Sequence, residues 1–184
     1  TEIAGADCEL SILKNGNWEV VDRFTSTTDG PHRTEGLLIA GKDYLYKEVT
    51  APNGYAYAVS IRFHVNADGT ISNARYVNED GKSLVYGADG RPTQVIYSET
   101  LAGESYTLNR QTLTKTGSDL VDAAGTVIVT DAKVQLPVTD NVIIMKDDPV
   151  RVSFEKTDFA GEEIAGAICT ISRKNADGTT TQID

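Results

Sequence analysis

Apolar and polar residues alternate along most of this chain, and the alternation begins almost at once. Near the start, apolar side chains occupy every second position: Ala6, Cys8, Leu10 and Ile12. A period of two predicts a β-strand with one buried face. The Lys14-Asn15-Gly16-Asn17 stretch then predicts a tight turn into a second strand over residues 18–24.

The same pattern continues with short segments separated by turn residues, and Asp68-Gly69 predicts a type I′ hairpin turn. Further strands are expected at residues 37–39, 44–49, 56–65, 70–77, 83–86, 94–98, 105–108, 126–130, 133–136 and 142–146. No window keeps a helical period for long, although residues 119–124 are compatible with a short helical turn. Many short strands joined by turns predict an all-β sandwich or barrel.

An internal repeat divides the chain. The sequence Glu-Ile-Ala-Gly-Ala at residues 2–6 recurs at residues 163–167, and Cys8 has its counterpart in Cys169. A self-match at long spacing indicates that one structural unit has ended and another has begun. The second copy follows an alternating segment, residues 150–158, whose counterpart in the first copy would precede Thr1. We therefore expect part of a longer protein.

Composition narrows the function classes. The net charge is −10, which argues against binding to nucleic acid phosphates or to anionic membrane surfaces. No apolar run reaches membrane-spanning length. Both cysteines, Cys8 and Cys169, are expected to be buried free thiols. Two cysteines are too few for a disulfide scaffold. His32 and His64 lack metal-ligand spacing, so neither a metal site nor a cofactor is expected.

Four segments stand out by their motifs. Glu48 to Tyr55 reads Glu-Val-Thr-Ala-Pro-Asn-Gly-Tyr, and the stretch of residues 27–44 lies ahead of it. Residues 142–147 lie near the end of the first unit, and residues 154–167 open the second. In this order they resemble the glutamate-bearing signature, the stretch ahead of it, the closing strand and the opening strand of the Cna-B or SpaA-type pilin domains of Gram-positive surface proteins. The resemblance implies an immunoglobulin-like or prealbumin-like β-sandwich.

On this resemblance, residues 1–148 form one Cna-B-like sandwich that lacks its first strand. The segment of about residues 72–139 is longer than a minimal domain needs and is read as a β insertion. Residues 149–184 are then the first strands of a second repeat.

The resemblance also implies an autocatalytic isopeptide bond. Its lysine attacks an aspartate carboxyl group while a buried glutamate moves the proton. Carried onto this chain, Glu48 is the proton shuttle and Asp147 the acceptor, while Lys156 is the nucleophile of the next repeat or of an intermolecular bond. Asp148 is expected to point to the opposite face of its strand. Burial would favour the neutral amine and the neutral acid that this condensation needs.

The function expected first is a structural stalk or backbone module of a pilus or cell-wall-anchored surface adhesin. It would be extracellular, with neighbouring repeats or pilin subunits as partners, and not an enzyme. A second possibility is an adhesin domain that binds host matrix protein or glycan through residues 72–139. A third is an accessory β-sandwich of a secreted hydrolase. Residues 136–140 resemble a sortase signal but are predicted to be a loop.

Overall fold

The computed structural model describes residues 2–175 and 177–183, and it separates into two compact units, Thr1–Val150 and Arg151–Asp184. All regular structure in the described residues is β, and every strand pairing is antiparallel. This confirms the predicted all-β class. Each unit is described by itself.

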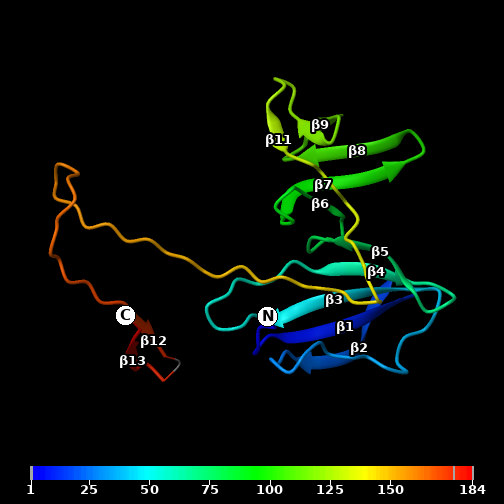
Figure 1. The fold of residues 1–184 in the computed structure, drawn as a ribbon, viewed down its shortest axis with the longest axis horizontal. Coiled ribbons are helices and arrows are strands. Elements are labelled where there is room, and N and C mark those ends of the chain that lie inside the picture. The colour runs from blue at the N-terminus through cyan, green and yellow to red at the C-terminus, as the bar shows by residue number, and fades with distance from the viewer. Residues whose placement is uncertain (1, 176, 184) are drawn as a thin grey trace. The chain divides into compact units, whose positions relative to one another are not determined.

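The first sheet of the N-terminal unit holds five strands in the order β2-β1-β3-β4-β5 (Figure 1). Their bounds are β1 Asp7–Lys14, β2 Asn17–Thr25, β3 Lys42–Thr50, β4 Ile61–Val65 and β5 Ile71–Tyr76. Asn15 and Gly16 both have positive φ, as a type I′ turn between β1 and β2 requires. Asp68 does not, so the predicted I′ turn between β4 and β5 is wrong: only Gly69 has positive φ there.

The alternating pattern builds the core of this sheet. In β4, Ile61, Phe63 and Val65 are buried while Arg62 and His64 point the other way. The buried face joins β1, β3, β4 and β5, with Ile12 and Tyr44 almost fully enclosed. Burying side chains of this size supplies most of the stabilisation of a sheet face.

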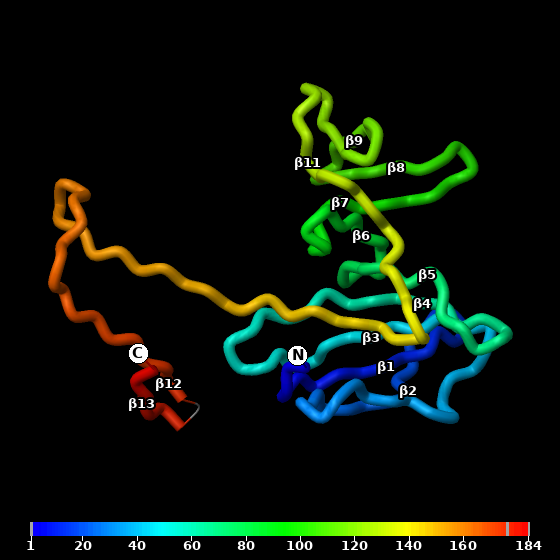
Figure 2. The backbone as a smooth tube through the Cα atoms, in the orientation of Figure 1, coloured from blue at the N-terminus to red at the C-terminus, as the bar shows by residue number. Residues whose placement is uncertain are grey.

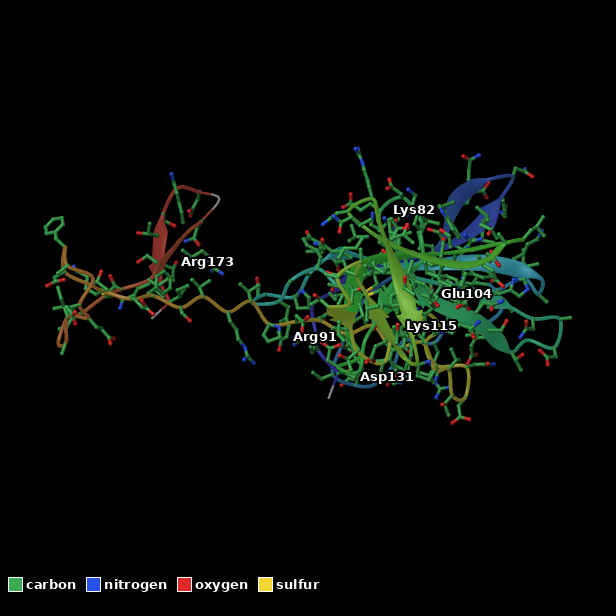
Figure 3. The ribbon with its side chains drawn as sticks, turned by 90° about the horizontal axis from the view of Figure 1, so that it is seen from above. Lys82, Arg91, Glu104, Lys115, Asp131 and Arg173 are labelled. Atoms are coloured by element: carbon green, nitrogen blue, oxygen red, sulfur yellow. The ribbon has the colours of Figure 1, made fainter. Side chains whose placement is uncertain are left out.

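A second sheet follows, with six strands in the order β11-β10-β9-β8-β7-β6. Its bounds are β6 Leu84–Tyr86, β7 Pro92–Thr100, β8 Gly103–Leu108, β9 Gln111–Thr116, β10 Asp119–Val121 and β11 Val127–Val129. It has its own apolar cluster around Val85, Val95 and Leu120. On its surface Glu104 and Lys115 form an ion pair at 3.7 Å (Figure 3).

The chain then returns from the second sheet to the first (Figure 2). Residues 142–148 alternate between inward and outward side chains, and Ile143 and Met145 pack on the core of the first sheet. This segment is extended but is not paired as a strand. Its end is tied down where Ala56 N–H donates to the Asp148 carbonyl at 2.9 Å and Val150 N–H donates to the Gly54 carbonyl at 2.8 Å.

The C-terminal unit contains one hairpin, β12 Ser172–Lys174 with β13 Thr180–Gln182. None of its described residues is buried. The predicted strand at residues 150–158 is extended and exposed, without a named strand. Cys169 is also exposed, so the prediction of two buried thiols holds for Cys8 alone.

Some predicted elements differ from the structure. Residues 119–124 were expected as a helical turn, but Asp119–Val121 is strand β10, because pairing with β9 and β11 completes its hydrogen bonds. Strand β9 was not predicted. Residues 37–39, 56–60, 133–136 and 142–146 have strand-like sequences yet lie outside the strands. Residues 72–76, assigned to the insertion, belong to β5 of the first sheet.

Candidate functional site

Glu48 is the one charged side chain that is buried in the described residues, with 4% of its surface exposed. It lies near the end of β3, and its Cα is paired with that of Cys8 on β1. Tyr44 and Glu48 are four positions apart and face the same side of the strand, so the alternation that buries the tyrosine also buries the carboxyl group. A buried carboxyl group needs compensation from hydrogen bonds.

Backbone from outside the sheet supplies one such bond. The N–H of Ala58 donates to Oε2 of Glu48 at 2.7 Å. Ala58 belongs to residues 56–60, which were expected to continue β4 but leave the ladder instead. The backbone donor that reaches Glu48 is therefore available because this stretch is not a strand.

The second partner of Glu48 is Asp147, 99 positions later in the chain by the printed numbering. Asp147 is the half-buried, inward member of the 142–148 segment, and its carboxyl group lies within hydrogen-bonding reach of Glu48. A hydrogen bond between two acids requires that one of them carries a proton. The structure thus brings together two of the three residues that the sequence singled out.

The pKa values of both acids are raised. Burial raises the pKa of Glu48, the Ala58 N–H opposes this, and the nearby Asp147 raises it further. Burial also raises the pKa of Asp147, while its interaction with Glu48 lowers it in part. Burial and the repulsion between two carboxylates favour the protonated form of these acids.

Cys8 and Tyr46 complete the neighbourhood. The Tyr46 hydroxyl donates to Sγ of Cys8 at 3.6 Å. Burial raises the pKa of both the Cys8 thiol and the Tyr46 hydroxyl, and the two carboxyl groups raise them further. Both groups therefore stay neutral near pH 7. Sequence reasoning did not include them in the site, although Tyr46 and Glu48, two positions apart on one strand, share a face.

Lys156, the third residue that the sequence singled out, belongs to the C-terminal unit. Its side chain is exposed, and its amine donates to the carbonyl of Thr157 at 3.2 Å. Within the described residues, no lysine is among the groups that shift the pKa of Glu48 or Asp147. Asp148 points outward and pairs with Arg91 at 2.8 Å. Lys156 thus belongs to a different unit from Glu48 and Asp147, and its role as the nucleophile stays a prediction.

Other candidate residues have ordinary structural partners. His32 stacks on Phe24 and contacts Asp22, while His64 contacts Asp43. In the part of the chain that the structure describes, no three His, Cys, Asp or Glu side chains are placed to hold a metal ion. Over the same residues, no helix is long and apolar enough to cross a membrane.

Comparison with known proteins assigns the first part of the chain. Residues 1–80 match the family model of the SpaA prealbumin-like fold domain. The predicted resemblance is thereby confirmed over β1 to β5, the strands that carry Glu48. No curated protein and no solved structure matches the chain.

Proposed function

Because residues 1–80 carry a SpaA-type prealbumin-like domain, a module of pilins and surface proteins, we propose that this chain is a structural segment of a pilus or surface adhesin that locks itself with an isopeptide bond. Asp147 is the acceptor, Glu48 the proton shuttle, and a lysine on a strand added beside residues 142–147 is the nucleophile. The observation that carries this is the half-buried carboxyl group of Asp147 beside the buried Glu48 of the first sheet, with the pKa of both acids raised.

The geometry suits the chemistry because the acceptor must be a neutral acid. Raised pKa values favour the protonated form of these acids, whereas an exposed carboxylate is a poor electrophile. A lysine buried at the same place would lose its proton for the same reason. Its Nζ would then attack Cγ of Asp147, forming a C–N bond.

Glu48 takes the proton released by the amine and returns one to the departing oxygen. One C–O bond of Asp147 breaks and water leaves, so the step needs no other reactant. The fold supplies the close approach that makes amide formation feasible.

The place for the added strand is the 142–148 segment. Its inward side chains pack on the core, but its backbone has no ladder partner within the described residues. Unpaired backbone of this kind accepts an added strand through main-chain hydrogen bonds. Covalent closure between that strand and Asp147 would carry tensile load through a covalent bond, which suits a stalk in a pilus.

Residues 150–158 provide a suitable test strand because they alternate apolar and polar side chains ahead of Lys156, and their apolar side chains are exposed. A synthetic peptide of this sequence should form a covalent adduct with the chain, one water lighter than the sum of the two masses. Peptide mapping should place the bond between Lys156 of the peptide and Asp147. Asp147→Ala should abolish the adduct, and Glu48→Gln should slow it by at least about a hundredfold.

Two controls make the test specific. A peptide with Lys156→Arg should not react, and the chain with Asp148→Asn should react as the unmodified chain does. An adduct that persists in Asp147→Ala would refute the assignment of the acceptor. A lack of any adduct with this peptide, combined with an uncrosslinked Asp147 in the longer chain containing the preceding strand, would refute the self-locking function.

The same lysine can react within a longer chain or between chains. Bonding between chains would produce a ladder of covalent oligomers on a denaturing, reducing gel, and Asp147→Ala would remove the ladder. A single monomer band would restrict Lys156 to its own repeat.

A further inference from the structure

The outer face of the first sheet has a small hollow of about 260 Å³ that the isopeptide chemistry does not use. It is lined by residues of β3, β4 and β5 and by Ser83 just before β6, and its Arg62 and His64 lie on the face of β4 opposite the core. Its polar lining consists of Asp43, Arg62, His64, Asn73, Arg75 and Ser83. In a chain of net charge −10, this lining contains two arginines and one acid.

The two arginines face each other in a costly arrangement. Arg62 on β4 and Arg75 on β5 are direct register partners across the antiparallel pair. Like charges at directly opposite positions destabilise a sheet. An acidic residue at one of these two positions would make the sheet more stable. The pair of arginines therefore indicates a role other than stabilising the sheet.

Only one of the two arginines is neutralised. Asp43 is hydrogen-bonded to both Arg62 and His64. Burial alone would raise the pKa of Asp43, but these two partners hold it below its ordinary value, so Asp43 is an anion that fixes Arg62 in place. Arg75 has no carboxylate partner among the described residues, and its Nη1 makes only a long 3.4 Å bond to Oγ of Ser83.

The backbone is irregular at the same point. The β4–β5 register shifts between Arg62 and His64, where two steps on β4 oppose three on β5. The additional residue, Asn73, has φ of 53°, in the left-handed region that few residues other than glycine and asparagine tolerate. Bulges of this kind re-aim side chains and are over-represented near binding sites.

We propose that this hollow binds the carboxylate or sulfate group of an acidic sugar. Arg75 and the remaining N–H groups of Arg62 bind the oxyanion, because the planar guanidinium group matches two oxygen atoms at once. The Ser83 hydroxyl and the Asn73 amide lie where they can bond sugar hydroxyls. The half-exposed ring of Trp18, with the Arg62 guanidinium 5.7 Å from its centroid, offers a flat face beside the charge.

The test is a calorimetric titration of the full chain with short oligosaccharides of three kinds: hyaluronan-derived with carboxylates, heparin-derived with added sulfates, and chitin-derived without charge. Binding is expected for one or both acidic series and not for the neutral series. Arg75→Gln should weaken the binding at least about tenfold. The acidic series that binds more tightly identifies the oxyanion.

Arg110→Gln is the matched control, because it removes the same charge from an exposed arginine on the β8–β9 turn. Arg110→Gln should leave the binding affinity unchanged. An equal loss of affinity in both variants would mean that only the overall charge matters, and it would overturn the site. Binding of the neutral series with equal affinity would overturn it too, as would the absence of binding in all three series.

Thermal unfolding without sugar separates a binding role from a structural one. Arg75→Gln removes the like-charge pair and should unfold at the same or a higher temperature, whereas a lower temperature would make Arg75 a structural residue. In NMR spectra of the unmodified chain, the Nε–H resonances of Arg62 and Arg75 should shift when the acidic sugar is added. This measurement does not require that any variant folds. Shifts confined to other arginines would overturn the site.

Discussion

A carboxyl group in the core of a β-sheet is costly, and Glu48 is retained there by two specific contacts. Ala58 supplies a backbone donor, and Asp147 lies within hydrogen-bonding reach. Neither contact would form in the unfolded chain, where both acids are solvated. The protonation of the pair therefore differs between the folded and unfolded states, and stability must depend on pH.

The sign of this dependence follows from the raised pKa values. The folded pair holds protons at pH values where the unfolded chain has lost them, so its contribution to stability is present below the ordinary carboxyl pKa. That contribution is lost as pH rises through the raised values. Glu48→Gln, which keeps both hydrogen bonds without the titration, should be more stable than the unmodified chain near pH 8, on the order of 1 kcal/mol. The difference should shrink towards pH 4.

Chemical denaturation across this pH range measures the effect, with the chain free of any added strand. Asp148→Asn is the control, because Asp148 is exposed on the opposite face. Parallel pH curves for Glu48→Gln and the unmodified chain would show that the two acids do not share a proton.

At the scale of the elements, the N-terminal unit has two apolar clusters, and their boundary does not coincide with the boundary between the two sheets. Ile12 and Tyr44 belong to the first cluster together with Leu84 and Tyr86 of β6, and Val95 and Leu120 belong to the second. Leu120 is fully buried although β10 is a short strand. Strands β8 to β11 thus depend on the second cluster, whereas β6 contributes side chains to both.

Leu120→Ala should destabilise the second sheet by about 2–5 kcal/mol, because it leaves a cavity in a small core. Hydrogen exchange followed by mass spectrometry should show faster exchange over β8 to β11, with β1 to β5 still protected. Ile12→Ala is the matched change in the first sheet and should show the reverse. Equal loss of protection in both sheets after either change would mean that they unfold as one unit.

Strands and turns were predicted correctly where the local sequence pattern alone decides them. They were predicted poorly where pairing with another strand decides them. The turn at Asn15-Gly16 and strands β1, β2 and β4 follow from turn chemistry and period-two alternation. Residues 56–60 and 142–146 are apolar runs that also suit a strand, but they are not strands. A strand needs a neighbour with free backbone groups, and no local pattern states where that neighbour lies.

At the scale of the whole molecule, the repeated sequence is folded differently in its two copies. In the N-terminal unit, Cys8 is buried in a five-stranded sheet; in the C-terminal unit, Cys169 is exposed beside one hairpin. A hairpin without a packed face is marginal in water. The apolar residues of the C-terminal unit, such as Phe154 and Ile168, have no core to enter within the described residues.

Limited digestion with trypsin should therefore cut first after Arg151 and Lys156. The fragment that ends there should persist, and its unfolding temperature should match that of the full chain, because the core clusters lie within residues 1–150. Intact-mass measurement over the time course checks both points. Early cleavage inside β1 to β5 would contradict the difference in stability between the units.

The sequence by itself determined the all-β class, the repeat and the two acidic residues on matching motifs, because alternation, turns and motifs are local properties of the chain. Only the tertiary structure decided that Glu48 and Asp147 lie together beside Cys8, since that depends on how a distant segment returns to the sheet. It alone also placed Arg75 opposite another arginine. Contacts between distant segments are set by register and packing, which no single stretch of sequence encodes.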